Sequence, residues 1–190
     1  MTPKILAFAG SLRTDSFNKK LIRIGAEGAR SAGADVTLID LRDYPMPVYD
    51  GDLEAAGMPE TVLQLKKLFL EHQGLLIASP EYNGSIPGPL KNAIDWVSRV
   101  APGERPLASY ADKVAALLSA SPGAAGGMRA LVHLRASLTH INVLLIPQQV
   151  SVSKAHEALN PDGSLKDAKQ QAAVHNVAKK LVETIAKLRA

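Results

Sequence analysis

Near its N-terminus the chain reads Gly10-Ser11-Leu12-Arg13-Thr14-Asp15-Ser16-Phe17-Asn18. The apolar run Lys4–Ala9 before it is typical of a buried strand, and residues 18–32 after it are typical of a helix that stops at Gly33. The first N–H groups of a helix lack backbone partners and carry partial positive charge, so a short polar loop at this point can bind an anion. The stretch therefore predicts an anion site at the start of the first helix.

The polar side chains of this loop suit a single phosphate. They are hydroxyls, one amide and one guanidinium, from Ser11, Thr14, Ser16, Asn18 and Arg13. A guanidinium can hold two phosphate oxygens while the smaller groups donate to the others. The loop has one glycine and matches neither G-x-G-x-x-G nor a P-loop, which favours a mononucleotide phosphate over a pyrophosphate. Taken alone, it is also consistent with a plain turn in which Ser16 or Asn18 caps the helix.

The rest of the chain alternates between apolar runs typical of strands and segments typical of helices. Further strands are expected at residues 35–40, 75–79, 114–119 and 142–146, and further helices at 59–74, 90–99, 128–139 and along the C-terminal segment up to residue 188. This alternation, without a linker, predicts one domain over residues 1–190: a doubly wound, five-stranded parallel sheet with helices on both faces. Ligands bind such sheets beyond the carboxyl ends of the strands, so the loops after the first, third and fourth strands are the candidates.

A long irregular connection is expected between residues 41 and 58. Connections of this length in a compact domain are usually functional or interfacial. We therefore expect this segment to contact a ligand or another subunit.

The loop after the third expected strand, residues 80–89, contains three prolines and two glycines, which restrict its backbone. A rigid loop suits a flat heteroaromatic ring: backbone groups of residues 81–84 can meet its polar edge, and Tyr82 supplies an aromatic surface. A proline-stiffened connection without a ligand is the alternative. Residues 121–127, after the fourth strand, are small and glycine-rich and allow close approach. A loop that can bind a phosphate, a rigid loop that can support a flat ring and a loop of small residues that allows close approach together fit FMN.

The composition disfavours several other classes of protein. The chain has no cysteine, which excludes disulfides and thiolate catalysis, and no apolar stretch near the ~20 residues that span a bilayer. A net charge of +4 without a dense basic stripe, and only 4% aromatic residues, argue against nucleic acid as a partner. The five histidines lack zinc-site spacing, and no G-x-S-x-G nucleophile elbow is present. We expect a cytoplasmic protein that binds neither membranes nor nucleic acid and holds no metal.

The sequence resembles the NADPH-dependent FMN reductases of flavodoxin-like fold, a family that includes bacterial quinone and chromate reductases. The resemblance rests on the loop at residues 10–18, on segments 80–88 and 90–96, and on residues 121–127. It implies the strand order 2-1-3-4-5, FMN as cofactor, and NADPH or NADH as hydride donor. It also implies a homodimer or homotetramer in which a second subunit completes the pocket, with residues 41–58 and the helix after Gly127 as contact regions.

Carried over by position, the resemblance assigns three groups of cofactor-binding residues. They are Ser11, Arg13, Ser16, Phe17 and Asn18 for the phosphate, Pro80, Glu81, Tyr82, Asn83 and Gly84 for the ring, and Ser121 for the side of the ring. Catalysis falls to the flavin, so no catalytic side chain is assigned. Asp15 departs from the family pattern, because a carboxylate beside a phosphate is unfavourable, and we expect it to face solvent or Arg13.

The activity that the resemblance implies is transfer of a hydride from NAD(P)H through the flavin to quinones, chromate, azo compounds, ferric complexes or free flavin. The alternative is a flavodoxin-type electron carrier without NAD(P)H turnover. Flavodoxins tend to be acidic and to clamp the ring between aromatic residues, whereas this chain is basic and poor in aromatic residues. A flavin-free interaction domain would require all three loops to be coincidental. The sequence shows no basic cluster that is recognisable as a binding site for the 2′-phosphate of NADPH, so the choice between NADH and NADPH stays open.

Overall fold

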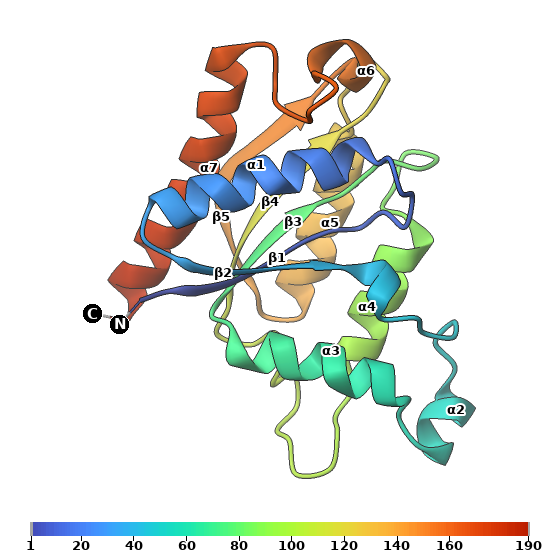
Figure 1. Ribbon diagram of the computed structural model, residues 1–190. Coiled ribbons are helices and arrows are strands. Elements are labelled where there is room, and N and C mark those ends of the chain that lie inside the picture. The colour runs from blue at the N-terminus through green and yellow to red at the C-terminus, as the bar shows by residue number, and fades with distance from the viewer. Residues whose placement is uncertain (1, 190) are drawn as a thin grey trace.

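A five-stranded parallel sheet forms the middle layer of the computed structural model, which describes residues 2–189 (Figure 1). Its strands are β1 (Lys4–Ala9), β2 (Asp35–Asp40), β3 (Gly74–Ala78), β4 (Val114–Ala120) and β5 (Leu144–Val152). They lie in the order β2-β1-β3-β4-β5, and in the register Ile5 of β1 lies opposite Val36 of β2 and Gly74 of β3. The doubly wound sheet and its strand order are confirmed.

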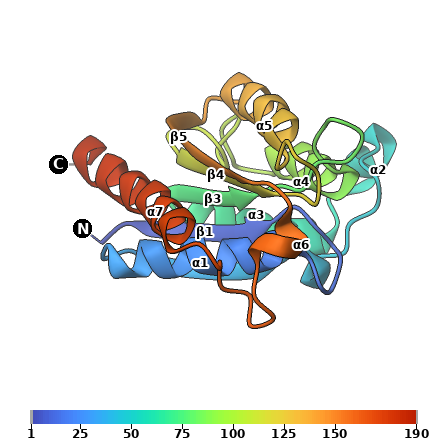
Figure 2. The ribbon, with the colours of Figure 1, turned by 90° about the horizontal axis from the view of Figure 1, so that it is seen from above.

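The longer helices cover both faces of this sheet (Figure 2). They are α1 (Phe17–Ser31) and α7 (Ala168–Leu188) on one face, and α3 (Glu60–Glu71), α4 (Gly88–Ser98) and α5 (Met128–His140) on the other. The connections contain the 3₁₀ turn η1 (Leu41–Asp43) and the short helices α2 (Gly51–Ala56) and α6 (Ala155–Ala158). None of the helices within residues 2–189 is both long and apolar enough to cross a bilayer.

Alternate side chains of the central strands enter two separate cores. In β1, Ile5 and Ala7 pack with α1 and α7, whereas Leu6 and Phe8 pack with α3, α4 and α5. This period of two follows from the geometry of an extended strand. Because β1, β3 and β4 are buried on both faces, their sequences are continuous apolar runs rather than alternating ones.

Two segments differ from the sequence-based expectation. The connection at residues 41–58 is only partly irregular, because it contains η1 and α2, and α2 projects from the body with no buried residue (Figure 1). Strand β5 continues past Pro147 to Val152, although the apolar run ends at Ile146. Proline cannot donate a ladder hydrogen bond, but β5 is an edge strand and its pairing with β4 shifts register between Ala115 and Leu117, which accommodates the proline.

The C-terminal end of α4 is held by a buried lysine of α3. Lys66 Nζ donates to the carbonyl oxygens of Val97 (3.1 Å) and Arg99 (2.7 Å) and pairs with Glu104 (2.9 Å). A cation near the last carbonyls of a helix is favourable. This anchor fixes α4 with its N-terminus at the carboxyl edge of the sheet, beside the loop that follows β3.

Candidate functional site

The loops after β1, β3 and β4 meet at the carboxyl edge of the sheet and enclose a cavity of about 50 Å³. Most of the predicted site residues line it: Ser11, Arg13, Ser16, Phe17 and Asn18 from the first loop, Pro80, Glu81 and Tyr82 from the second, and Ser121 beside Ala120 and Pro122 from the third. A volume of roughly two water molecules suits a phosphate group and not a ring. Asn83 and Gly84 lie outside this lining.

Two serine hydroxyls shape the loop after β1. Ser16 has extended backbone angles (φ −88°, ψ 130°), and its Oγ accepts a hydrogen bond from the backbone N–H of Asn18 at 3.2 Å, so it is the N-cap of α1. Ser11 Oγ accepts from the backbone N–H of Arg13 at 3.3 Å. Both hydroxyls act as acceptors here, which leaves their own protons free to donate to an anion in the cavity.

Arg13 supplies the positive charge of this loop. Its side chain is exposed and forms no hydrogen bond or ion pair within the part of the chain that the structure describes. Asp15 instead pairs with Lys20 at 2.7 Å and faces solvent, as expected; this hydrogen bond and the Lys20 charge lower the pKa of the Asp15 carboxyl. The negative charge next to Arg13 is therefore balanced by another residue, and the guanidinium keeps all its donors.

Asn18 has both ends of its side-chain amide bound to protein backbone. Its Nδ2 donates to the carbonyl oxygen of Ala120 at 2.8 Å, and its Oδ1 accepts from the N–H of Ala120 at 2.9 Å. The residue is only 2% exposed. This pair of bonds joins the first turn of α1 to the end of β4, so the structure gives Asn18 the role of positioning two loops around the cavity.

The loop after β3 contains a two-residue hairpin. The N–H and C=O groups of Tyr82 and Ser85 bond to each other at 3.0 and 3.1 Å, and Asn83 and Gly84 between them have φ values of 51° and 76°. Two positive φ values are what a type I′ turn requires, and Asn-Gly is the dipeptide that adopts it most readily. The rigidity of this loop therefore comes from the hairpin as well as from the prolines. The Asn83-Gly84 dipeptide is a sequence signal for this turn that the sequence analysis does not use. Tyr82 is 46% exposed, so its ring has a free face.

Glu81 lines the cavity but uses its carboxylate elsewhere. Oε2 accepts from the backbone N–H groups of Arg129 (3.0 Å) and Ala130 (3.4 Å), and Oε1 pairs with the Arg129 guanidinium at 2.8 Å. Helix α5 follows Gly127, which has φ 90°, and has no cap from its own N-cap side chain. A carboxylate at a helix N-terminus is favourable, so Glu81 serves as the missing cap and ties the loop after β3 to α5.

We expect Glu81→Gln to lower the free energy of unfolding by about 1–2 kcal/mol, because the helix end loses a charged cap and an ion pair. Denaturant titration of the apoprotein measures this change. Glu60→Gln is the matched control, since Glu60 lies in the first turn of α3, where it bonds the exposed side chain of Gln64. Equal stability of the Glu81→Gln and Glu60→Gln variants would show that the cap has no energetic role.

The fold and this edge of the sheet define a class of protein. A doubly wound parallel sheet with a phosphate-sized cavity at the first strand–helix turn, flanked by a rigid hairpin, is the architecture of a flavodoxin-like mononucleotide-binding protein. Residues 3–157 match the sequence profile of the NADPH-dependent FMN reductases, and the chain belongs to this family.

Individual relatives agree with this assignment. The chain is 39% identical over 167 residues to an NAD(P)H-dependent FMN reductase from Pseudomonas aeruginosa, covering 87% of this chain and 86% of the relative. It is 35% identical over 144 residues to a quinone reductase from Escherichia coli K12, covering 75% and 73%. Among solved structures, FerB, a flavoenzyme NAD(P)H:(acceptor) oxidoreductase from Paracoccus denitrificans, aligns with a TM-score of 0.83 and 32% identity over 98% of both chains.

Proposed function

We propose that this protein is an FMN-dependent oxidoreductase that takes a hydride from NAD(P)H and passes two electrons to quinones or other small acceptors. Membership of the NADPH-dependent FMN reductase family supports the cofactor and the donor, and relatives named as quinone reductases support the acceptor class. The observation that carries the proposal is the phosphate-sized cavity at the start of α1, beside the Tyr82–Ser85 hairpin.

The residues of the first loop fit the phosphate of FMN. Ser11 and Ser16 can donate from their hydroxyls and Arg13 from its guanidinium, and the N-terminal end of α1 adds partial positive charge. Asn18 holds the loop after β4, with Ser121, against this group. None of these side chains has to react, because bound FMN itself supplies the two-electron chemistry.

The hairpin after β3 is suited to the polar edge of the ring. The backbone N–H groups of Asn83 and Gly84 have no hydrogen-bond partner within residues 2–189. They lie at the tip of a turn whose dihedral angles are fixed, so they can donate to a negatively charged ring edge without reorganising. Tyr82 offers the exposed face of its ring as an aromatic surface.

A flavodoxin-type carrier shares this fold: an archaeal flavodoxin aligns with a TM-score of 0.63 at 12% identity, a likeness of fold alone. The carrier alternative is not favoured, because the family match and the named relatives are NAD(P)H-dependent enzymes. Tyr82 and Phe17 are the aromatic residues that line the cavity within the described chain, and they do not form a pair that could clamp a ring.

Anaerobic mixing of the FMN-loaded protein with NADPH, and separately with NADH, tests the function. We expect the flavin absorbance to bleach without any partner protein and to return when a quinone is added. Calorimetric titration of the apoprotein should show tighter binding of FMN than of FAD, because the cavity fits a terminal phosphate. Bleaching by neither nucleotide would favour the carrier, and absence of flavin binding would overturn both functions. The acceptors to compare with quinones are chromate, azo compounds, ferric complexes and free flavin. We propose a cytoplasmic location for the protein.

We also propose self-association. Four large exposed apolar side chains lie in the two regions expected to make contacts: Val48 (83% exposed) in the connection after β2, Leu53 (44%) on α2, and Met128 (54%) and Val132 (59%) on α5. Burying such side chains against a second copy would stabilise a dimer. Light scattering should show a dimer or tetramer, and Val132→Glu should shift it toward monomer, whereas Leu63→Glu on the exposed side of α3 should not. A wild-type monomer that is fully active at assay concentration would contradict this prediction.

A further inference from the structure

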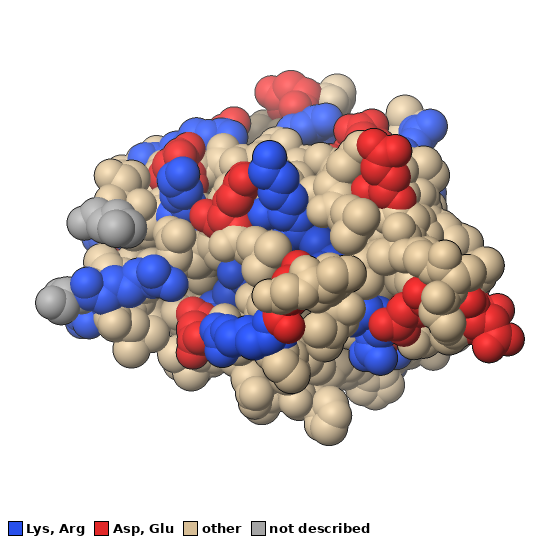
Figure 3. Space-filling view, turned by 90° about the horizontal axis from the view of Figure 1, so that it is seen from below, with Lys and Arg blue, Asp and Glu red and all other residues tan. Residues whose placement is uncertain are grey.

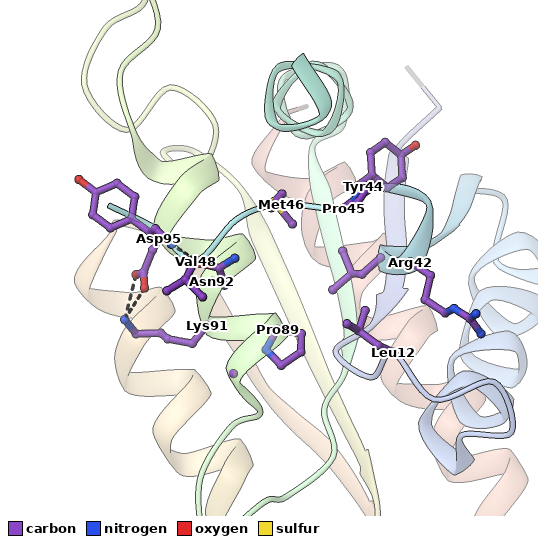
Figure 4. Close-up of a pocket in the computed structure, with 13 residues that line it drawn as sticks. Leu12, Arg42, Tyr44, Pro45, Met46, Val48, Pro89, Lys91, Asn92 and Asp95 are labelled. Atoms are coloured by element: carbon purple, nitrogen blue, oxygen red, sulfur yellow. Dashed lines mark hydrogen bonds and ion pairs between the residues drawn. The ribbon is translucent and has the colours of Figure 1, made fainter. Parts of the chain in front are cut away.

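A second hollow, of about 770 Å³, lies beside the phosphate-sized cavity (Figure 4). Its walls come from the loop after β1, from the connection after β2, and from the first turns of α4. They are mostly apolar, with contributions from Leu12, Tyr44, Pro45, Met46, Val48 and Pro89. Small-molecule sites typically have roughly 300–1,000 Å³ and walls of this kind. None of the residues that we propose to bind FMN lines this hollow.

The hollow and the cavity share a wall. Leu12 lines the hollow, while its neighbours Ser11 and Arg13 line the cavity. Gly88 and Pro89, on the far side of the hollow, follow shortly after the Tyr82–Ser85 hairpin. A molecule in the hollow therefore lies next to the place where we put the cofactor.

The outer wall of the hollow is held in position by α4. Asn92 Nδ2 and Trp96 Nε1 both donate to the carbonyl oxygen of Pro47 at 2.8 Å, and Asn92 Oδ1 accepts from the N–H of Tyr49 at 2.8 Å. The Tyr49 ring also meets Trp96 edge-on at 5.0 Å between centroids. Because these bonds form within the chain itself, the hollow is preformed.

Arg42 leaves a positive charge at the rim of the hollow. Figure 4 shows its side chain leading away from the other lining residues, so that the guanidinium lies just outside the hollow, on the far side of Leu12. Nη1 donates to Thr14 Oγ1 at 2.6 Å, and the side chain forms no ion pair within residues 2–189. The other charged residues of the wall, Lys91 and Asp95, pair with each other at 2.9 Å.

The acidic residues near Arg42 do not cancel this charge. Asp40 pairs with Lys19 at 2.5 Å and accepts from the backbone N–H of Arg42; burial acts to raise the pKa of Asp40, but these contacts bring it below its usual value. Asp43 lies beside Lys19 and Arg23 in a separate pocket. Neither carboxylate forms an ion pair with the Arg42 guanidinium within the described residues.

We propose that the hollow binds the adenosine half of NADPH, with Arg42 contacting the 2′-phosphate. This proposal rests on the proposed use of NAD(P)H. The nicotinamide must reach the flavin ring near Tyr82, so the rest of the dinucleotide extends into neighbouring space, and the hollow is a preformed space there. A flat adenine ring fits apolar walls such as those made by Pro45, Met46 and Pro89, and a guanidinium is the usual partner of a 2′-phosphate. The site distinguishes NADPH from NADH.

Calorimetry on the FMN-loaded protein tests the site directly, with adenosine 2′,5′-bisphosphate and adenosine 5′-monophosphate as probes. The wild type should bind the bisphosphate roughly 10- to 100-fold more tightly, as one charge-assisted contact would give. Arg42→Gln should abolish this difference. Arg23→Gln is the matched control, because it removes an exposed arginine on α1 near the same edge of the sheet and should keep the difference. Val48→Glu, at a side chain that is 83% exposed, should weaken both probes by placing a carboxylate in the hollow.

Steady-state kinetics supply a second readout. In Arg42→Gln the KM for NADPH should rise roughly 10- to 100-fold while the KM for NADH and both kcat values stay unchanged. Equal binding of the two probes by the wild type, or equal weakening of both by Arg42→Gln, would overturn the proposal. A second copy of the chain in the hollow would overturn it too, and would appear as no binding of either probe together with a changed oligomeric state in Val48→Glu. Failure of the wild type to oxidise either NADPH or NADH would instead count against the proposed function.

Discussion

Arg13→Ala is expected to weaken FMN binding by about 10- to 150-fold. A charge-assisted hydrogen bond contributes roughly 1.5–3 kcal/mol, and each ~1.4 kcal/mol is a factor of ten in affinity. Arg13 forms no ion pair within the described residues, so its guanidinium can bind the phosphate without first breaking a contact to the protein. The fold should be retained, because Ser16 still caps α1. Calorimetric titration of the apoprotein with FMN measures the change.

Two further variants make this result specific. Arg13→Lys should recover only part of the affinity, because an ammonium cannot make two parallel bonds to a phosphate. Arg30→Ala removes an arginine at the opposite end of α1, where it bonds the carbonyl oxygen of Val36, and should leave FMN affinity unchanged. If Arg13→Ala binds FMN as tightly as the wild type, Arg13 points away from the phosphate and the loop must be reassigned.

Asn18→Ala is expected to lower the free energy of unfolding of the apoprotein by about 2–6 kcal/mol. The change removes two hydrogen bonds and leaves the buried N–H and C=O groups of Ala120 without partners, at roughly 1–3 kcal/mol each. Asn18→Asp should be at least as harmful, because its carboxylate cannot donate to the Ala120 carbonyl oxygen. FMN affinity should fall as well, since the loop after β4 loses its tie to α1.

Urea titration without flavin separates a positioning role from a direct one. Were Asn18 only a phosphate ligand, its replacement would weaken FMN binding and leave the apoprotein as stable as before. Asn176→Ala on α7 is the control, because that asparagine is exposed and has no hydrogen bond within residues 2–189; it should change stability by less than about 0.5 kcal/mol. A loss below about 1 kcal/mol in Asn18→Ala would contradict the positioning role.

Local patterns in the sequence were sufficient for the elements of the fold. The continuous apolar runs of β1, β3 and β4 reflect burial on both faces, and the N-cap Ser16 and the glycine after α1 are local signals for the ends of that helix. The strand order came from the family resemblance, because no local pattern states which strands are neighbours. The predicted end of β5 at Ile146 is wrong, because a strand tolerates Pro147 only where it lies at the edge of a sheet.

The sequence by itself also placed most of the cavity residues in three loops, since the carboxyl ends of parallel strands meet at one edge. Only the tertiary structure decided what their side chains do. Asn18 and Ala120 are 102 residues apart, and Glu81 and Arg129 are 48 apart. A short amide or carboxylate bonds whichever group lies within about 3 Å, and that group is set by how distant segments pack. For the same reason Arg42 becomes a rim cation only when the fold brings it to Thr14, 28 residues away, at the edge of a hollow whose opposite wall is α4.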